Sequence, residues 1–131
     1  MTNIQDKHLE QLKSKMVESY RKFNYGMRDN KKSSTFKGLP DSYYEEKIQQ
    51  FADGITFKMG KKYLAVRLTN DRGYQSAWGF INVGNPKFKE GDILKAAGYG
   101  TPALNKARGN LFEDYEVSWT GPHYLVGVKY S

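Results

Sequence analysis

A chain of 131 residues suits one domain with a modest hydrophobic core, and its lack of cysteine excludes disulfides, thiol catalysis and cysteine-ligated zinc. The formal net charge of +7 favours an anionic partner, which is nucleic acid, a nucleotide or an acidic protein. No apolar run is long enough to span a bilayer and the N-terminus has no signal-peptide core, so we expect a cytoplasmic protein without membrane contact.

Two helices are predicted in the first part of the chain. Residues 1–25 contain an amphipathic helix, from about residue 3 to residue 24, because regularly spaced apolar residues form one stripe. A glycine follows its end, and residues 26–39 are expected to form a basic loop. A proline opens a second helix at residues 40–53. The stripe of the first helix covers the sheet or pairs with another subunit, and it consists of Ile4, Leu9, Leu12, Met16, Tyr20 and Phe23.

From residue 55 the apolar pattern becomes that of strands. The segments ITFKM, KKYLAVRLT and QSAWGFINV are rich in β-branched and aromatic residues and are joined by short turns, which indicates an antiparallel meander. In the second segment Leu64, Val66 and Leu68 share the face expected to pack in the core. A last strand, HYLVGVKY at residues 123–130, is expected to pair with the preceding VSWT.

Residues 1–131 are therefore predicted to form a single α+β domain. Its antiparallel sheet of four to five strands lies within residues 55–131, and its helices gather mainly on one face. Besides the long N-terminal helix we expect one or two shorter helices. One of these begins at Pro102, where PALNKA follows a glycine-rich bend.

Catalytic chemistry is not indicated by the sequence. Nothing brings the two histidines, His8 and His123, together as a metal pair, and the carboxylates form local clusters at helix starts and in loops. Neither a GxxxxGK[ST] nor a GxGxxG phosphate loop occurs. We therefore expect a binding protein that is not an enzyme and that uses neither a metal nor a cofactor.

Residues 91–110, GDILKAAGYGTPALNKARGN, mix glycine, proline, amide and cationic residues in a way that no ordinary strand or surface helix needs. A glycine-rich bend before a short helix points backbone N–H groups outward, which suits a phosphate. Arg108 adds a planar fork of donors for the same group. The alternative is an Arg108–Asp92 ion pair that fixes the loop. The other expected contact residues are Asp92 for a ribose hydroxyl, Asn105 and Asn110 for ribose or base edges, and Lys95.

Two aromatic residues of the third strand are further candidates. Strict alternation places Trp78 and Phe80 on the same face, where both are core residues or at least one ring stacks on a purine. Stacking on a base contributes roughly 1–3 kcal/mol. Gly79 between them lets a ligand or another backbone approach the opposite face closely.

The block GDILKAA, a proline–alanine pair and ARGN together resemble small phage proteins whose middle is closer to SW-x-APAKHARGN. Here the chain reads GYGTPALNKARGN, so Tyr99 stands in for the tryptophan. The length, the leading helix and a WGF strand before a GD turn also resemble the Thoeris anti-defence sponge proteins of phages, first type. The matching block covers roughly residues 62–125.

This resemblance implies a function and a site. Members of that family sequester cyclic ADP-ribose isomers made by bacterial TIR-domain enzymes, without cleaving them, and some bind cyclic oligonucleotides at separate sites. They are small antiparallel sheets with helices that assemble as dimers or larger oligomers, so a dimer or hexamer is implied here. Phe80 would stack on the purine, Arg108 would bind a phosphate, Asp92 would contact ribose or base, and Arg28 would complete the pocket.

Two other functions are compatible with the basic charge. In the first, a single-stranded nucleic acid stacks on Trp78, Tyr74 and Tyr99, and lysines neutralise its phosphates. These lysines are Lys58, Lys61, Lys62, Lys87 and Lys89. In the second, the basic surface and the first helix block a host protein.

Overall fold

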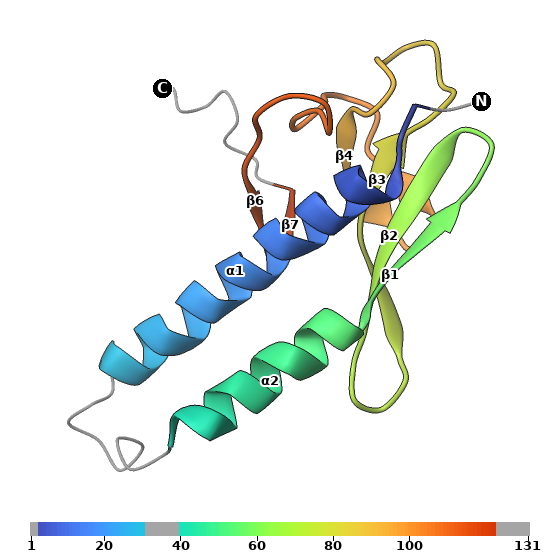
Figure 1. Cartoon of the computed structure of the whole chain (residues 1–131). Coiled ribbons are helices and arrows are strands. Elements are labelled where there is room, and N and C mark those ends of the chain that lie inside the picture. Colours follow the sequence, from blue (N-terminus) through green and yellow to red (C-terminus); the bar gives the residue numbers. More distant parts are fainter. Residues whose placement is uncertain (1–2, 31–39, 123–131) are drawn as a thin grey trace.

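The computed structural model describes the backbone of residues 3–30 and 40–122, and the side chains of these residues except 27–30. The described residues form two helices, α1 (Asp6–Asn30) and α2 (Asp41–Asp53), beside a five-stranded antiparallel sheet of order β1-β2-β3-β4-β5 (Figure 1). A separate two-stranded hairpin joins β6 and β7. The predicted α+β class is therefore confirmed. The strands are β1 (Ile55–Met59), β2 (Tyr63–Thr69), β3 (Gln75–Asn82), β4 (Ile93–Gly98), β5 (Thr101–Pro102), β6 (Val117–Ser118) and β7 (Gly121–Pro122).

The first helix is displaced toward the C-terminus relative to the sequence prediction. It begins at Asp6, and the Nδ1 atom of His8 accepts a hydrogen bond of 2.9 Å from the backbone N–H of Gln5, as in a capping box. At its other end the helix continues through Gly26, which adopts no positive φ and so forms no helix stop. The expectation of a loop from residue 26 was therefore wrong for residues 26–30, and residues 31–39 lie outside the described part.

The main core lies between α1 and one face of the sheet. Leu12 and Met16 of α1 are fully buried there against Leu64 and Val66 of β2. Leu68 packs at the edge of the same cluster, so the predicted core face of β2 is confirmed. Figure 1 shows α1 crossing in front of the sheet, with α2 beside it. The opposite face of the sheet carries a second, smaller apolar cluster built on Ala65, Phe80 and Leu94.

A β-bulge separates the two aromatic residues that strict alternation places together. Val66 pairs with Gly79 and Arg67 pairs with Ala77, so Trp78 is an extra residue in β3. Trp78 therefore turns into the core beneath α1, whereas Phe80 lies in the smaller cluster on the other face. The prediction that both rings share one face was wrong, because the alternation changes phase at the bulge.

The stretch after β4 also differs from its prediction. Where a short helix was expected from Pro102, Thr101–Pro102 forms the edge strand β5, paired with β4, and no helix follows in the described residues. An edge strand tolerates proline, because no hydrogen bond of the sheet needs the N–H group that proline lacks. The segment VSWT contributes β6, which pairs with β7, and the strand predicted at residues 123–130 lies outside the described residues.

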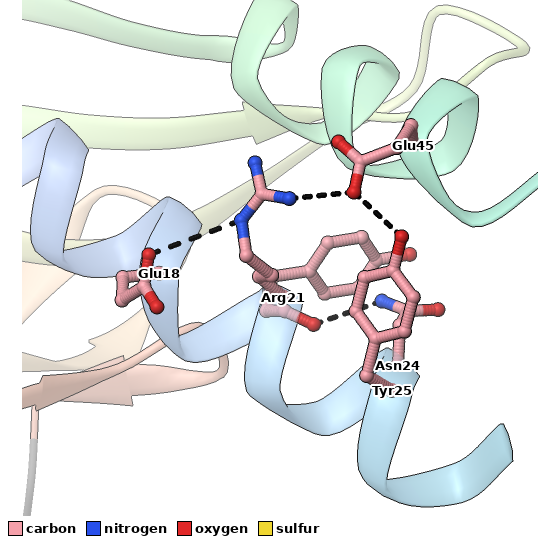
Figure 2. A network of polar contacts seen from close by, with 6 residues as sticks. Glu18, Arg21, Asn24, Tyr25 and Glu45 are labelled. Carbon is pink, nitrogen blue, oxygen red and sulfur yellow. Dashed lines mark hydrogen bonds and ion pairs between the residues drawn. The ribbon is translucent and has the colours of Figure 1, made fainter. Parts of the chain in front are cut away.

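A small polar network joins the two helices (Figure 2). Nη1 of Arg21 and the hydroxyl of Tyr25, both on α1, donate to Oε2 of Glu45 on α2, each over 2.6 Å. The hydrogen bond from Tyr25 and then that from Arg21 lower the pKa of Glu45 below its ordinary value of 4.5. The folded state therefore binds the Glu45 proton less readily than the unfolded chain does.

We expect this network to make stability depend on acid pH. Because the pKa of Glu45 is lowered by folding, its stabilisation is complete above the ordinary value of 4.5 and is lost as the pH falls through the folded-state pKa. Thermal melts of the wild type and Glu45→Gln, from neutral into acid pH, measure this. The difference in Tm should shrink on acidification, whereas Glu46→Gln should show no such trend. Parallel pH profiles for the wild type and Glu45→Gln would contradict the assignment.

Candidate functional site

The loop of residues 83–92, between β3 and β4, is organised by one buried asparagine. Asn82 is 1% exposed, and its Nδ2 atom lies 3.0, 3.2 and 3.0 Å from the carbonyl oxygens of Asn85, Phe88 and Lys89. Its Oδ1 atom accepts from the N–H of Asn85 over 3.0 Å. A single side chain thus fixes both halves of the loop.

Asp92 and Asn110, two of the predicted contact residues, hold the end of the same loop. Nδ2 of Asn110 donates to Oδ1 of Asp92 over 2.9 Å and to the carbonyl of Glu90 over 3.0 Å. The N–H of Lys89 donates to Oδ2 of Asp92 over 3.0 Å. Both side chains are buried, so they stabilise the loop from inside. The alternative Arg108–Asp92 ion pair stays a prediction.

Four exposed lysines lie on this loop and on the neighbouring β1–β2 turn. The N–H groups of Val83 and Gly84 donate to the carbonyl of Lys62 over 2.8 and 3.0 Å, which joins the β1–β2 turn to the loop. Nζ of Lys87 donates to the carbonyl of Leu104 over 2.6 Å. We call this region the basic end of the sheet, defined by Lys61, Lys62, Lys87 and Lys89. Its charge raises the local concentration of anions.

Backbone hydrogen bonds hold Arg108 beside β4. Its N–H donates to the carbonyl of Ile93 over 2.7 Å, and the N–H of Ile93 donates to the carbonyl of Gly109 over 2.8 Å. The side chain is 4% exposed, and among the described residues it is the one buried cationic side chain. A buried guanidinium needs polar or anionic surroundings, which makes this position exceptional in so small a core.

Only some of the predicted contact residues lie together. Phe80 is buried opposite Leu94, so Phe80, Asp92, Arg108 and Asn110 all lie along β4 or beside it. Trp78 lies on the other face, where its Nε1 donates to the carbonyl of Ser118 over 2.9 Å. Lys95 and Asn105 are exposed. Arg28 belongs to the last turns of α1, and its side chain is outside the described ones.

The sheet face away from α1 carries a cation–aromatic pair that the sequence did not indicate. The guanidinium of Arg67 lies 4.5 Å from the ring centre of Tyr99, whose hydroxyl donates to Oε1 of Gln75 over 3.0 Å. Tyr74, which precedes β3, is 70% exposed. These groups offer flat surfaces to solvent.

Comparisons of the chain with protein-family models, with curated proteins and with solved structures found no match. Within residues 3–30 and 40–122, no three or more histidine or carboxylate side chains are grouped so as to hold a metal ion. No helix in that part is long and apolar enough to cross a membrane. The geometry of the loop and of its surroundings is therefore the basis for proposing a function.

Proposed function

We propose that this protein binds and sequesters a cyclic nucleotide signal, a cyclic ADP-ribose isomer, without cleaving it. The observation that carries the proposal is the fixed loop of residues 83–92, which has a polar interior and exposed lysines around it. In this role it is a phage anti-defence protein that acts in the cytoplasm of the infected bacterium and blocks TIR-based signalling, as the resemblance of residues 62–125 implies.

A compact ligand with two phosphates suits this end of the molecule better than an uncharged one does. The lysines of the basic end attract the phosphates. Arg108 and Phe80 lie beside the same strand, β4, at its contacts with Ile93 and Leu94. They are the proposed phosphate and purine contacts.

The burial of Arg108 and Phe80 bears on the assembly. Both are less than 5% exposed in one subunit, so a ligand contacts them only after a local opening of the chain. We therefore place the pocket next to a subunit contact in a dimer or hexamer, with Arg28 as a contributor from the end of α1. If this opening accompanies assembly of the subunits, ligand binding and oligomerisation are thermodynamically linked.

The experiment is a thermal melt with and without a cyclic ADP-ribose isomer. At about 100 times Kd, a ligand that binds only the folded state raises Tm by on the order of 10 °C for a domain of this size. Arg108→Lys keeps the charge but loses the planar fork, and we expect it to abolish most of this shift. The double variant Lys87→Ala/Lys89→Ala should weaken binding about tenfold, by analogy with other phosphate contacts.

The matched control is Lys22→Ala, which removes an exposed charge from α1, away from the loop. Its ligand-induced shift should equal that of the wild type. The melting temperature without ligand has to be recorded for every variant, because Arg108 is buried and its replacement also lowers stability. Unchanged ligand shifts in both Arg108→Lys and the double lysine variant would refute the proposed site.

A second candidate function is binding of single-stranded nucleic acid on the face away from α1. The Arg67–Tyr99 pair favours it, because rings and guanidinium planes stack on bases. Trp78 takes no part in such binding, since it lies in the core beneath α1, on the other face of the sheet. An oligonucleotide shift assay at two salt concentrations decides: this function requires binding that weakens steeply with salt.

A further inference from the structure

A pocket of about 430 Å³ opens on the side of the molecule away from the basic end. It is lined by α1, α2, the β2–β3 turn and the β6–β7 turn. Its volume lies within the usual range for small-molecule sites, roughly 300–1,000 Å³. Of the residues predicted from the sequence to contact a ligand, Tyr74, a candidate stacking ring for single-stranded nucleic acid, lines it. The main lining side chains are Tyr20, Lys47, Gln50, Phe51, Tyr74 and Trp119.

Three aromatic rings form the inner wall of this pocket. Tyr20 stacks on Phe51 with 4.4 Å between ring centres, and Trp119 meets Tyr20 edge-on at 5.0 Å. All three rings are only half-buried, although they pack on one another. A ring face left in contact with water beside other rings is a ready stacking surface for a planar ligand.

The position of Trp119 is fixed by two hydrogen bonds to its hairpin. The N–H of Trp119 donates to Oγ of Ser19 on α1 over 3.0 Å. The preceding carbonyl, that of Ser118, accepts from Nε1 of Trp78 in the core over 2.9 Å. The indole is therefore presented by a hairpin tied to both α1 and β3. A site whose wall is fixed in advance binds its ligand with a smaller entropy loss.

The rim of the pocket supplies polar groups of defined chemistry. Lys47 is half-buried, and its ammonium group lies 5.6 Å from the ring centre of Tyr43. Gln50 and Ser76 offer donors and acceptors, and the exposed carboxylate of Asp71 is an acceptor. A cation on one side and amide or hydroxyl groups around aromatic faces match a flat heterocycle that carries an anionic substituent.

We infer that this aromatic pocket, defined by Tyr20, Lys47, Gln50, Phe51, Tyr74 and Trp119, binds a mononucleotide-like ligand. The heterocycle stacks on the wall of Phe51 and Trp119, with Tyr74 closing the outer side, and the anionic group lies at Lys47. The site shares no residue with the basic end, so the inference goes beyond the proposed function and does not depend on it.

Isothermal titration of the full chain with AMP, adenosine and ribose 5-phosphate tests the pocket. We expect AMP to bind more tightly than adenosine, because only AMP brings a negative charge to Lys47. We expect no binding of ribose 5-phosphate, which lacks the heterocyclic base. Trp119→Ala should weaken AMP binding at least about fivefold, the lower end of the usual loss when one base-stacking ring is removed. Lys47→Met should bring AMP to the affinity of adenosine.

Two further variants distinguish a loss of binding from a loss of folding. Tyr74 is 70% exposed, so Tyr74→Ala leaves the core intact and should still weaken AMP several-fold. Phe112→Ala removes an exposed ring outside the pocket and should bind AMP as the wild type does. The inference is overturned if AMP does not bind at millimolar concentration. It is also overturned if AMP binds equally to Trp119→Ala and Tyr74→Ala but fails to bind Arg108→Lys, which would place AMP at the basic end.

Discussion

Replacing Trp78 by alanine is expected to lower the free energy of unfolding by about 3–5 kcal/mol, the usual cost of removing a large aromatic side chain from a core. Trp78 is 2% exposed beneath α1, and its Nε1 donates to the carbonyl of Ser118 over 2.9 Å. The substitution therefore removes core packing and one anchor of the β6–β7 hairpin together. Urea unfolding followed by circular dichroism measures the loss.

Tyr74→Ala serves as the comparison, because this ring lies four residues earlier and is 70% exposed. It should change the free energy of unfolding by no more than about 0.5 kcal/mol. The two results together test the bulge in β3. If Trp78→Ala destabilised the protein as little as Tyr74→Ala does and instead removed ligand binding, Trp78 would be a surface contact and the bulge would be wrongly placed.

Replacing Asn82 by alanine is expected to cost about 3 kcal/mol, because buried carbonyl groups lose their donor without gaining water. The three carbonyls that its Nδ2 atom contacts belong to Asn85, Phe88 and Lys89, so the loop that carries the basic end also loses its shape. We expect ligand binding to weaken even at temperatures where the variant remains folded. Unfolding curves and a ligand titration on the same preparation separate these two effects.

Asn105→Ala is the matched control for Asn82, since it deletes the same amide from an exposed position. Its stability should stay within about 0.5 kcal/mol of the wild type. Asn82→Asp retains the acceptor for the N–H of Asn85 but loses the donors to the three carbonyls, so it should be destabilised nearly as much as Asn82→Ala. A fully stable Asn82→Asp would show that those carbonyl contacts contribute little.

Periodicity predicted the fold well where it extends over many residues. The stripe containing Leu12 and Met16, and the alternation of Leu64 and Val66, both place the core where the structure has it. The sequence did not predict the bulge at Trp78. One extra residue in a strand changes which residues point to each face, and it does so without any change in composition. Pro102 suits both a helix start and an edge strand, and pairing with β4 decides between them.

The site residues were harder to predict than the fold, because their roles depend on contacts distant in sequence. The sequence predicts Asp92 and Asn110 as ligand contacts because they are polar residues in a glycine-rich stretch, yet in the structure they hydrogen-bond to each other. Asn82 carried no local sign of its role, since the loop that it fixes forms only on folding. The aromatic pocket brings Tyr20, Phe51 and Trp119 together from three separate segments, and no single-segment pattern indicates this.

Sequestration requires the protein to hold the nucleotide signal intact. The most direct test is to incubate the full chain with lysate from bacteria with active TIR-domain signalling, remove unbound small molecules, denature the protein by heat and analyse the released material by mass spectrometry. We predict release of an intact cyclic ADP-ribose isomer, and none from Arg108→Lys carried through the same steps. Release of a cleaved product, or of no nucleotide at all, would contradict sequestration.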